Sequence, residues 1–252
     1  MVQDKRFPLT TRYDPSWVCK NSLGPHPLWL VEWLTQKMVM HPGMRILDLG
    51  CGKALTSIFL ALEYSSLVFA YDLEIKPEDN FIRISESGLQ DKVFPIMGEA
   101  HTLPFGAGFF DAIVAVNNYH YYATESTDLP YFLKFLRPGG EIGIVMPGLF
   151  QELGQAIPSH LAESQSSGDA FWQPEHESLH SAEWWGTLWS ECPGIELIAC
   201  GAMSDGGNLW LKWEQGLALA GSENRNPANL EALKKDKNTN LTLIRLVGRK
   251  TI

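Results

Sequence analysis

The feature that most constrains this chain is an alternation of strand-like and helix-length segments between residues 44 and 147. Short apolar runs alternate there with segments that carry apolar residues at helical spacing. The runs occupy residues 45–49, 67–71, 93–97, 110–116 and 141–146. Because parallel strands need a long crossover, usually a helix, this order predicts stacked βα units and a parallel sheet. Right-handed crossovers between five such strands form a doubly wound sheet.

The remaining segments are predicted to extend and cover this sheet. Strand-like runs at 195–200 and 241–247 are expected to pair as the last two strands of this α/β sheet. Pro95 makes its strand a candidate for the sheet edge. The length of 252 residues favours one elaborated domain over residues 1–252. Its expected parts are an N-terminal cap at 1–40, a core at 44–147, a lid insertion at 149–192 and C-terminal strands with a helix at 193–252.

Charge and hydropathy exclude several classes of protein. The 20 Lys and Arg residues face 29 Asp and Glu residues, a net charge of -9 that argues against binding to nucleic-acid phosphates or to an anionic membrane. No apolar run approaches the ~18 residues of a membrane span, and the first six residues lack the apolar segment of a signal peptide. We therefore expect a cytoplasmic protein. Its expected oligomeric state is a monomer or a homodimer.

The cysteine and histidine patterns predict no metal site. The four cysteines form no C-x-x-C pair and are expected to be reduced thiols. His176 and His180 have the spacing of a helical metal pair, but no further ligand nearby completes a site.

Two elements of the core point to a ligand at the carboxyl ends of the strands, where doubly wound sheets bind ligands. Gly50 and Gly52 form the first strand-to-helix turn, which lets backbone approach a ligand closely. Asp72 ends the next strand, where an acid can accept both hydroxyls of a ribose. Taken alone, the Gly50–Gly52 turn is also explained as an ordinary tight turn, and Asp72 as an ordinary cap. A nicotinamide dinucleotide is disfavoured, because Leu55 stands where its motif has the last glycine.

In order, four segments resemble the class I S-adenosylmethionine-dependent methyltransferases, in particular the small-molecule, type 11-like enzymes. They are Ile46 to Gly52, Asp72, the stretch from Gly98 to Asp111, and the turn Leu136 to Gly140. The chain departs from the family pattern twice. Ala54 stands where a third glycine is common, and Glu99 where an Asp is common.

The resemblance implies an α/β fold with a Rossmann-like doubly wound seven-stranded sheet, mostly parallel with an antiparallel last strand. It also implies S-adenosylmethionine as cofactor and S-adenosylhomocysteine as product. The cofactor contacts that it implies are Gly50, Cys51 and Gly52 around the methionine part, Asp48 orienting it, Asp72 and Leu73 at the ribose, Glu99 and Ala100 at the adenine, and Asn117 near the methionine end.

Methyl transfer from a sulfonium is an in-line displacement in which alignment supplies much of the rate. Where the acceptor is a hydroxyl or a protonated amine, a general base assists, and His suits that role near neutral pH. His120, after the fourth core strand, is the candidate base, and Tyr121 is the candidate positioning group. The alternative is that His120 fills a polar gap and that the tyrosine packs.

Nine tryptophans allow two interpretations. They wall a pocket for a flat or cationic acceptor, or they pack against the sheet, as Trp185 and Trp189 at helical spacing suggest.

The function expected from the sequence is transfer of a methyl group from S-adenosylmethionine to a small organic molecule, with no nucleic acid or membrane as partner. Two alternatives stay open at this point. One is a related carbon transfer to a lipid chain, and the other is a cofactor-binding protein without catalysis.

Overall fold

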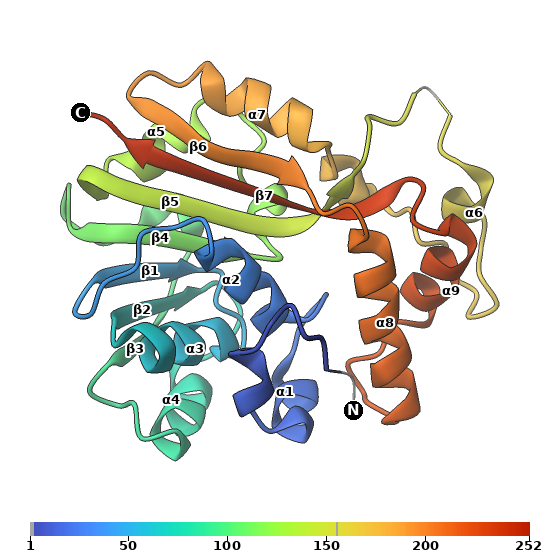
Figure 1. The fold of residues 1–252 in the computed structure, drawn as a ribbon, viewed down its shortest axis with the longest axis horizontal. Helices are drawn as coiled ribbons and strands as arrows, with labels where there is room; N and C mark the ends of the chain where they lie inside the picture. The colour runs from blue at the N-terminus through green and yellow to red at the C-terminus, as the bar shows by residue number, and fades with distance from the viewer. Residues whose placement is uncertain (1–2, 155) are drawn as a thin grey trace.

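A seven-stranded sheet forms the centre of the molecule in the computed structural model, which describes residues 3–154 and 156–252 (Figure 1). The strands are β1 (Arg45–Leu49), β2 (Leu67–Asp72), β3 (Val93–Met97), β4 (Phe110–Val116), β5 (Leu136–Leu149), β6 (Ile195–Ala202) and β7 (Leu241–Lys250). Their order is β3-β2-β1-β4-β5-β7-β6. Only β7 runs against its neighbours, so the predicted fold class, with an antiparallel last strand, is confirmed. Pro95 lies on edge strand β3, as predicted.

Helices cover both faces of this sheet, as the buried central strands require. On one face, α2 (Pro27–Thr35), α3 (Leu55–Tyr64) and α4 (Pro77–Glu86) contribute to one apolar core. On the other, α5 (Asp128–Leu133) and α7 (Ala182–Ser190) contribute to a second. The β1 side chains from Ile46 to Leu49 are all buried between them.

A smaller third core closes one end of the sheet. It joins α6 (Ser159–Ala162), α8 (Gly206–Leu219) and α9 (Pro227–Asp236) to the ends of β5 and β7. In Figure 1 these helices lie at the end of the sheet that also holds the N-terminal segment.

Several elements differ from the sequence-based prediction. Helix α1 (Pro15–Asn21) was not predicted, although the Asp14 side chain caps it by accepting a hydrogen bond from the Trp17 amide. The expected turn at 137–140 is part of β5, with a register shift opposite Phe110 and Ala112. The insertion at 149–192 was expected to hold two helices around a loop; it holds one full helix, α7, whereas α6 has only four residues.

No helix among the described residues is both long enough and apolar enough to cross a membrane.

Candidate functional site

A cavity of about 480 Å³ lies at the carboxyl ends of β1, β2 and β4. We call it the cleft. Its lining residues are Asn21, Leu23, Gly24, Pro27, Gly50, Cys51, Gly52, Lys53, Leu55, Thr56, Asp72, Leu73, Glu74, Ile75, Val116, Asn117, Asn118, Tyr121 and Tyr122. The structure therefore brings together most of the predicted site residues, from segments as far apart in sequence as Gly50 and Tyr121.

The turn after β1 has the open backbone that its glycines predict. Gly50 and Gly52 have φ angles of 71° and 53°, a region that glycine adopts without strain. A Cβ on Gly50 would collide with the side chain of Asn118, which donates a hydrogen bond from Nδ2 to the Gly50 carbonyl at 2.7 Å. Tyr122 in turn donates to Asn118 Oδ1 at 2.7 Å. Sequence reasoning missed both side chains, although the polar aromatic run after β4 contains them.

Ala54, the residue at the missing third glycine, is buried and has a φ of 60°. It directly precedes α3 as the N-cap residue and makes no side-chain hydrogen bond there. A left-handed conformation strains an L-residue by roughly 1–2 kcal/mol. The turn thus adopts a left-handed conformation at the position where the resemblance expects a glycine.

Asp72 fastens the turn to the end of β2. Its Oδ2 accepts a hydrogen bond from the Gly52 amide at 2.8 Å, and its Oδ1 accepts from the amides of Glu74 and Ile75 at 2.9 and 3.0 Å. Carboxylate oxygens accept more than one hydrogen bond, so Asp72 retains acceptor capacity toward the cleft.

Asp48 lies beneath the turn, is fully buried, and is not in the cleft lining described above. Its Oδ2 accepts hydrogen bonds from the Thr56 and Ser57 hydroxyls, both at 2.5 Å. Burial raises the pKa of the Asp48 carboxyl to about 6; the two hydroxyls oppose this shift and the charge of Asp72 adds to it. Oδ1 is buried without a hydrogen-bond partner among the described residues.

Cys51 contributes a neutral thiol to the cleft. Burial and the nearby charges of Asp48 and Asp72 raise the pKa of this thiol well above its ordinary value. A thiol in this state is a poor nucleophile.

Asn117 joins the end of β4 to the N-terminal segment. Its φ is 67°, and its Nδ2 donates to the carbonyls of Leu23 at 3.2 Å and Pro25 at 2.7 Å. Trp213 of α8 donates from Nε1 to the Gly24 carbonyl at 3.2 Å. These three bonds hold residues 23–25 at the rim of the cleft, while Asn117 Oδ1 is buried without a partner among the described residues.

Glu99 and Ala100, predicted at the adenine, are absent from the described lining of the cleft. Ala100 begins a short 3-10 helix, Ala100–Thr102. His101 of that helix bridges Glu99 at 3.1 Å and Asp128 of α5 at 3.0 Å. Leu73 does line the cleft and is exposed.

The two predicted catalytic residues have different environments. Tyr121 lines the cleft and is 60% exposed. His120 is 2% exposed, is absent from the described lining of the cleft, and contacts the Tyr121 ring with centroids 4.0 Å apart. Burial, and to a smaller extent the charge of neighbouring His176, lower the pKa of His120 to about 3. The imidazole is therefore uncharged at neutral pH.

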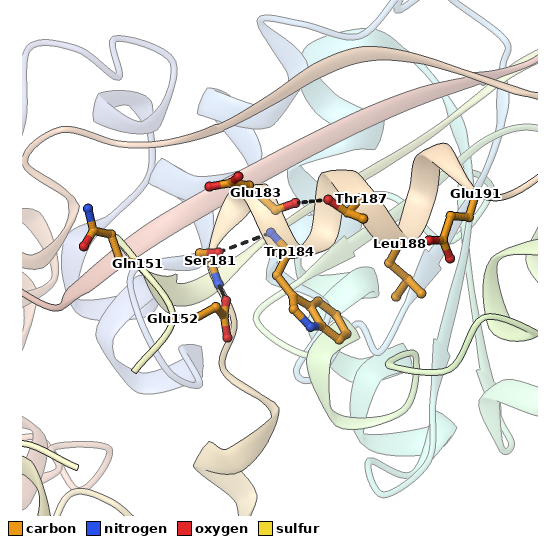
Figure 2. Close-up of a pocket in the computed structure, with 8 residues that line it drawn as sticks. All are labelled: Gln151, Glu152, Ser181, Glu183, Trp184, Thr187, Leu188 and Glu191. Atoms are coloured by element: carbon orange, nitrogen blue, oxygen red, sulfur yellow. Dashed lines mark hydrogen bonds between the residues drawn. The ribbon is translucent and has the colours of Figure 1, made fainter. Parts of the chain in front are cut away.

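None of the nine tryptophans is found in the described lining of the cleft. Four of them, Trp29, Trp185, Trp189 and Trp213, are among the largest fully buried side chains, as the packing interpretation expects. Trp184 lines a separate hollow of about 620 Å³ beside α7, together with Glu152, Glu183 and Glu191 (Figure 2). This hollow shares no residue with the cleft.

His176 and His180 are not paired as metal ligands would be. His176 packs against Phe171, whereas His180 stacks on Trp184 and contacts Glu152. Within residues 3–154 and 156–252, no group of three or more His, Cys, Asp or Glu side chains is arranged to hold a metal ion.

Comparison with known proteins finds methyltransferases that are similar to this chain. Residues 46–140 match a family model described as a methyltransferase domain. Over 136 residues the chain is 25% identical to "Methyltransferase GfsG" of Streptomyces halstedii, a match that covers 51% of this chain and 48% of the relative. The chain thus spans about half the length of that curated relative.

Two solved structures share the fold at low sequence identity. One, of Haemonchus contortus phosphoethanolamine N-methyltransferase 2 in complex with S-adenosyl-L-methionine, matches with a TM-score of 0.66 and 17% identity, covering 100% of this chain and 61% of that one. The other, of the [4+2]-cyclase SpnF, matches with a TM-score of 0.66 and 18% identity, covering 89% and 80%. Likeness at this level shows the fold alone.

Residues 46–140 are therefore similar to a methyltransferase domain, and the chain shares its fold with a solved methyltransferase that binds S-adenosyl-L-methionine. The matched segment runs from β1 to the start of β5, and the flanking segments complete the sheet and the rim of the cleft.

Proposed function

We propose that this protein transfers a methyl group from S-adenosylmethionine to a small organic acceptor, releasing S-adenosylhomocysteine. The observation that carries the proposal is the union, in one cleft, of the open Gly50–Gly52 turn and the Asp72 carboxylate. The family match over residues 46–140 supports the same conclusion.

The described residues fit this cofactor in two respects. Among the described residues, two buried oxygens lack hydrogen-bond partners: Asn117 Oδ1 at the rim of the cleft and Asp48 Oδ1 beneath the turn. An ammonium group supplies donors for such oxygens. The backbone at Gly50 and Gly52 is free of side chains, which leaves room for a ligand to approach.

In this proposal Asp72 binds the ribose hydroxyls, Leu73 packs beside it, and Gly50, Cys51 and Gly52 face the methionine part. Asp48 and Asn117 accept hydrogen bonds from its amino group. Bound, the cofactor supplies an electrophilic methyl group on a sulfonium. The protein aligns the acceptor with that methyl and excludes water, which converts a bimolecular step into an effectively unimolecular one.

Tyr121 is proposed to position the acceptor, because it is the exposed aromatic side chain at the cleft. The role of His120 as general base stays a prediction. A histidine with a pKa of about 3 is a weak base, so His120 would act only if acceptor binding changed its surroundings. The net charge of -9 supports a small molecule rather than a nucleic acid as acceptor. The cytoplasmic location and the monomer or homodimer stay predictions from the sequence.

Calorimetric titration tests the proposal. The purified chain is titrated with S-adenosylmethionine, S-adenosylhomocysteine and NAD, and we expect micromolar binding of the first two only. An acceptor screen that monitors S-adenosylhomocysteine formation then separates an enzyme from a protein that binds the cofactor without turnover. Absence of binding to both sulfur ligands would overturn the proposal.

A further inference from the structure

A second cavity, of about 420 Å³, adjoins the cleft. It lies between α1, the turn that precedes α3, α4 and the loop that follows α8. Asn21 and Lys53 line both spaces, so a ligand in the cleft lies next to this cavity. We call it the basic cavity, for the reason given next.

Cations dominate the lining of this cavity. Lys20, Lys53 and Arg83 contribute three positive charges, and Glu223 contributes one negative charge. The chain as a whole carries a net charge of -9, so a positive excess in one cavity is the reverse of its overall balance. The hollow beside α7 shows the opposite character, with three glutamates in its lining (Figure 2).

Neutral groups, rather than carboxylates, hold these cations. Arg83 donates from Nε to Asn21 Oδ1 at 3.1 Å and from Nη1 to Asn80 Oδ1 at 2.9 Å. Lys53 donates from Nζ to the Lys20 carbonyl at 3.2 Å. Among the described residues, no carboxylate lies within ion-pair distance of any of the three cations.

The cations are close enough to affect one another. Burial lowers the pKa of Lys53, and the charges of Arg83 and Lys20 lower it further, whereas Glu223 opposes the shift. An anion placed among these three side chains would relieve this repulsion. Arg and Lys are the residues that bind phosphate and carboxylate groups through charge-assisted hydrogen bonds.

Hydrogen bonds between separate elements fix the walls of the cavity in advance. Asn224 donates from Nδ2 to the carbonyls of Cys19 and Lys20 at 2.7 and 3.1 Å, which joins the loop after α8 to α1. Asn80 donates to the Gly52 carbonyl at 2.9 Å, which links the Arg83 helix to the turn of the cleft. Preorganised donors reduce the ordering that binding requires.

From these observations we infer that the basic cavity binds an oxyanion, a phosphate or carboxylate group, of the acceptor molecule. That the anion belongs to the acceptor rests on the proposed function. That the cavity binds an anion rests on the charges of its lining. The acceptor is therefore an anionic small molecule whose charged end contacts Lys53 and Arg83 while its reacting atom lies in the cleft.

The first experiment tests the anion without requiring activity. The full chain, saturated with S-adenosylhomocysteine, is titrated calorimetrically with inorganic pyrophosphate. We expect Lys53→Gln and Arg83→Gln each to weaken pyrophosphate binding at least tenfold, and Arg83→Lys, which keeps the charge, to recover part of it. The matched control Lys92→Gln removes a charge from an exposed position outside both cavities and should change binding less than twofold.

Two results would overturn the anion site. One is equal binding by all four variants. The other is loss of pyrophosphate binding whenever S-adenosylhomocysteine is present. That result would mean that the three cations bind the carboxylate of the cofactor. If pyrophosphate binds as expected while neither sulfur ligand binds, the proposed function fails and the anion site stands.

The second experiment identifies the source of the anion. With an acceptor from the screen, pyrophosphate should inhibit turnover competitively against that acceptor. Arg83→Gln should raise the acceptor KM at least tenfold and change kcat less than threefold. Noncompetitive inhibition would assign the cavity to a free anion acting as an effector and would overturn the link to the acceptor.

Discussion

The N-terminal segment and the insertion at 149–192 were both predicted to cover the ligand, yet the structure uses them differently. The N-terminal segment contributes Asn21, Leu23, Gly24 and Pro27 to the cleft, whereas no described residue of the insertion lines it. The insertion places Trp185 and Trp189 in the core on the α5 face of the sheet, and its 3-10 helix Pro174–Ser178 packs on the helix Tyr119–Tyr121.

The difference follows from where each segment is attached. Residues 23–25 are bonded to Asn117 at the carboxyl end of β4, the edge at which the cleft opens. The insertion leaves β5 at Leu149, bridges back to Ser181, and then forms α7 against β6 and β7. A high tryptophan content therefore does not show whether a segment covers the ligand site or packs in the core. A hydrogen bond to the strand end at the site does show that a segment lies over it.

The largest expected effect is on the free energy of unfolding, which a substitution in the insertion should lower without changing cofactor affinity. Trp189→Ala should lower the free energy of unfolding by about 3–5 kcal/mol, because it empties a fully buried site in the sheet core. Cofactor affinity of the folded variant should change less than twofold. Denaturant unfolding and calorimetry measure the two quantities, with the partly exposed Trp184→Ala as control. A tenfold loss of affinity in folded Trp189→Ala would contradict the assignment of this helix to the core.

The next effect uses pH, because a buried carboxyl beneath the cleft turn and one beside the insertion respond with opposite sign. Asp48, at the cleft, has a pKa raised from 3.8 to about 6. Between these values the folded state holds a proton that the unfolded state has released, so stability falls as pH rises from about 4 to 6. The loss is on the order of 2 kcal/mol, and Asp48→Asn should remove it.

Asp236 packs beside the insertion and is the buried carboxyl to be compared with Asp48. Burial raises its pKa, but hydrogen bonds from Asn240, His160 and the Leu241 amide outweigh burial and lower it overall. Its stabilising contribution is therefore present at neutral pH and is lost as pH falls below the ordinary range of an Asp. Asp236→Asn should be less stable than the parent at pH 7 and approach it in acid. Thermal unfolding from pH 3 to 7 checks both signs; slopes of the same sign would refute the contrast.

A smaller effect concerns the cofactor directly. Asp72→Ala should weaken binding of S-adenosylmethionine at least tenfold, about 1.4 kcal/mol, through loss of a charge-assisted contact. Calorimetry measures the affinity, and Asp91→Ala, at an exposed position outside the cleft, serves as control. Unchanged affinity in a folded Asp72 variant would remove the ribose assignment.

The smallest effect tests the fastening of the N-terminal segment. Asn117→Gly keeps the left-handed backbone accessible and removes the bonds to the Leu23 and Pro25 carbonyls. Each bond contributes about 1 kcal/mol or less, so we expect a several-fold weaker cofactor affinity and a small loss in Tm. If affinity is unchanged while limited proteolysis shows residues 23–25 released, the segment does not contribute to the ligand site.

Much of this architecture was predictable because the core segments obey local rules. The boundaries of β1, β3 and β4 agree with the prediction, since each is a short apolar run that ends at a Gly or an Asn. Gly50, Gly52 and Asp72 were found for the same reason: strand ends fix them at the cleft.

The remaining site residues depend on tertiary packing. Asn118 and Tyr122 act through contacts with a turn almost 70 positions earlier, which no local pattern encodes. His120 and Tyr121 are adjacent in sequence, but the 3-10 helix that holds them directs one ring into the interior and the other to the cleft.

Ala54 has a consequence for how such chains are recognised. Its left-handed backbone is maintained in a residue that does not favour it, while the hydrogen bonds of Asp72 and Asn118 hold the glycines that precede it. The shape of the turn therefore belongs to the surrounding sheet rather than to a third glycine. A motif search that demands that glycine will pass over proteins whose turn is built as this one is.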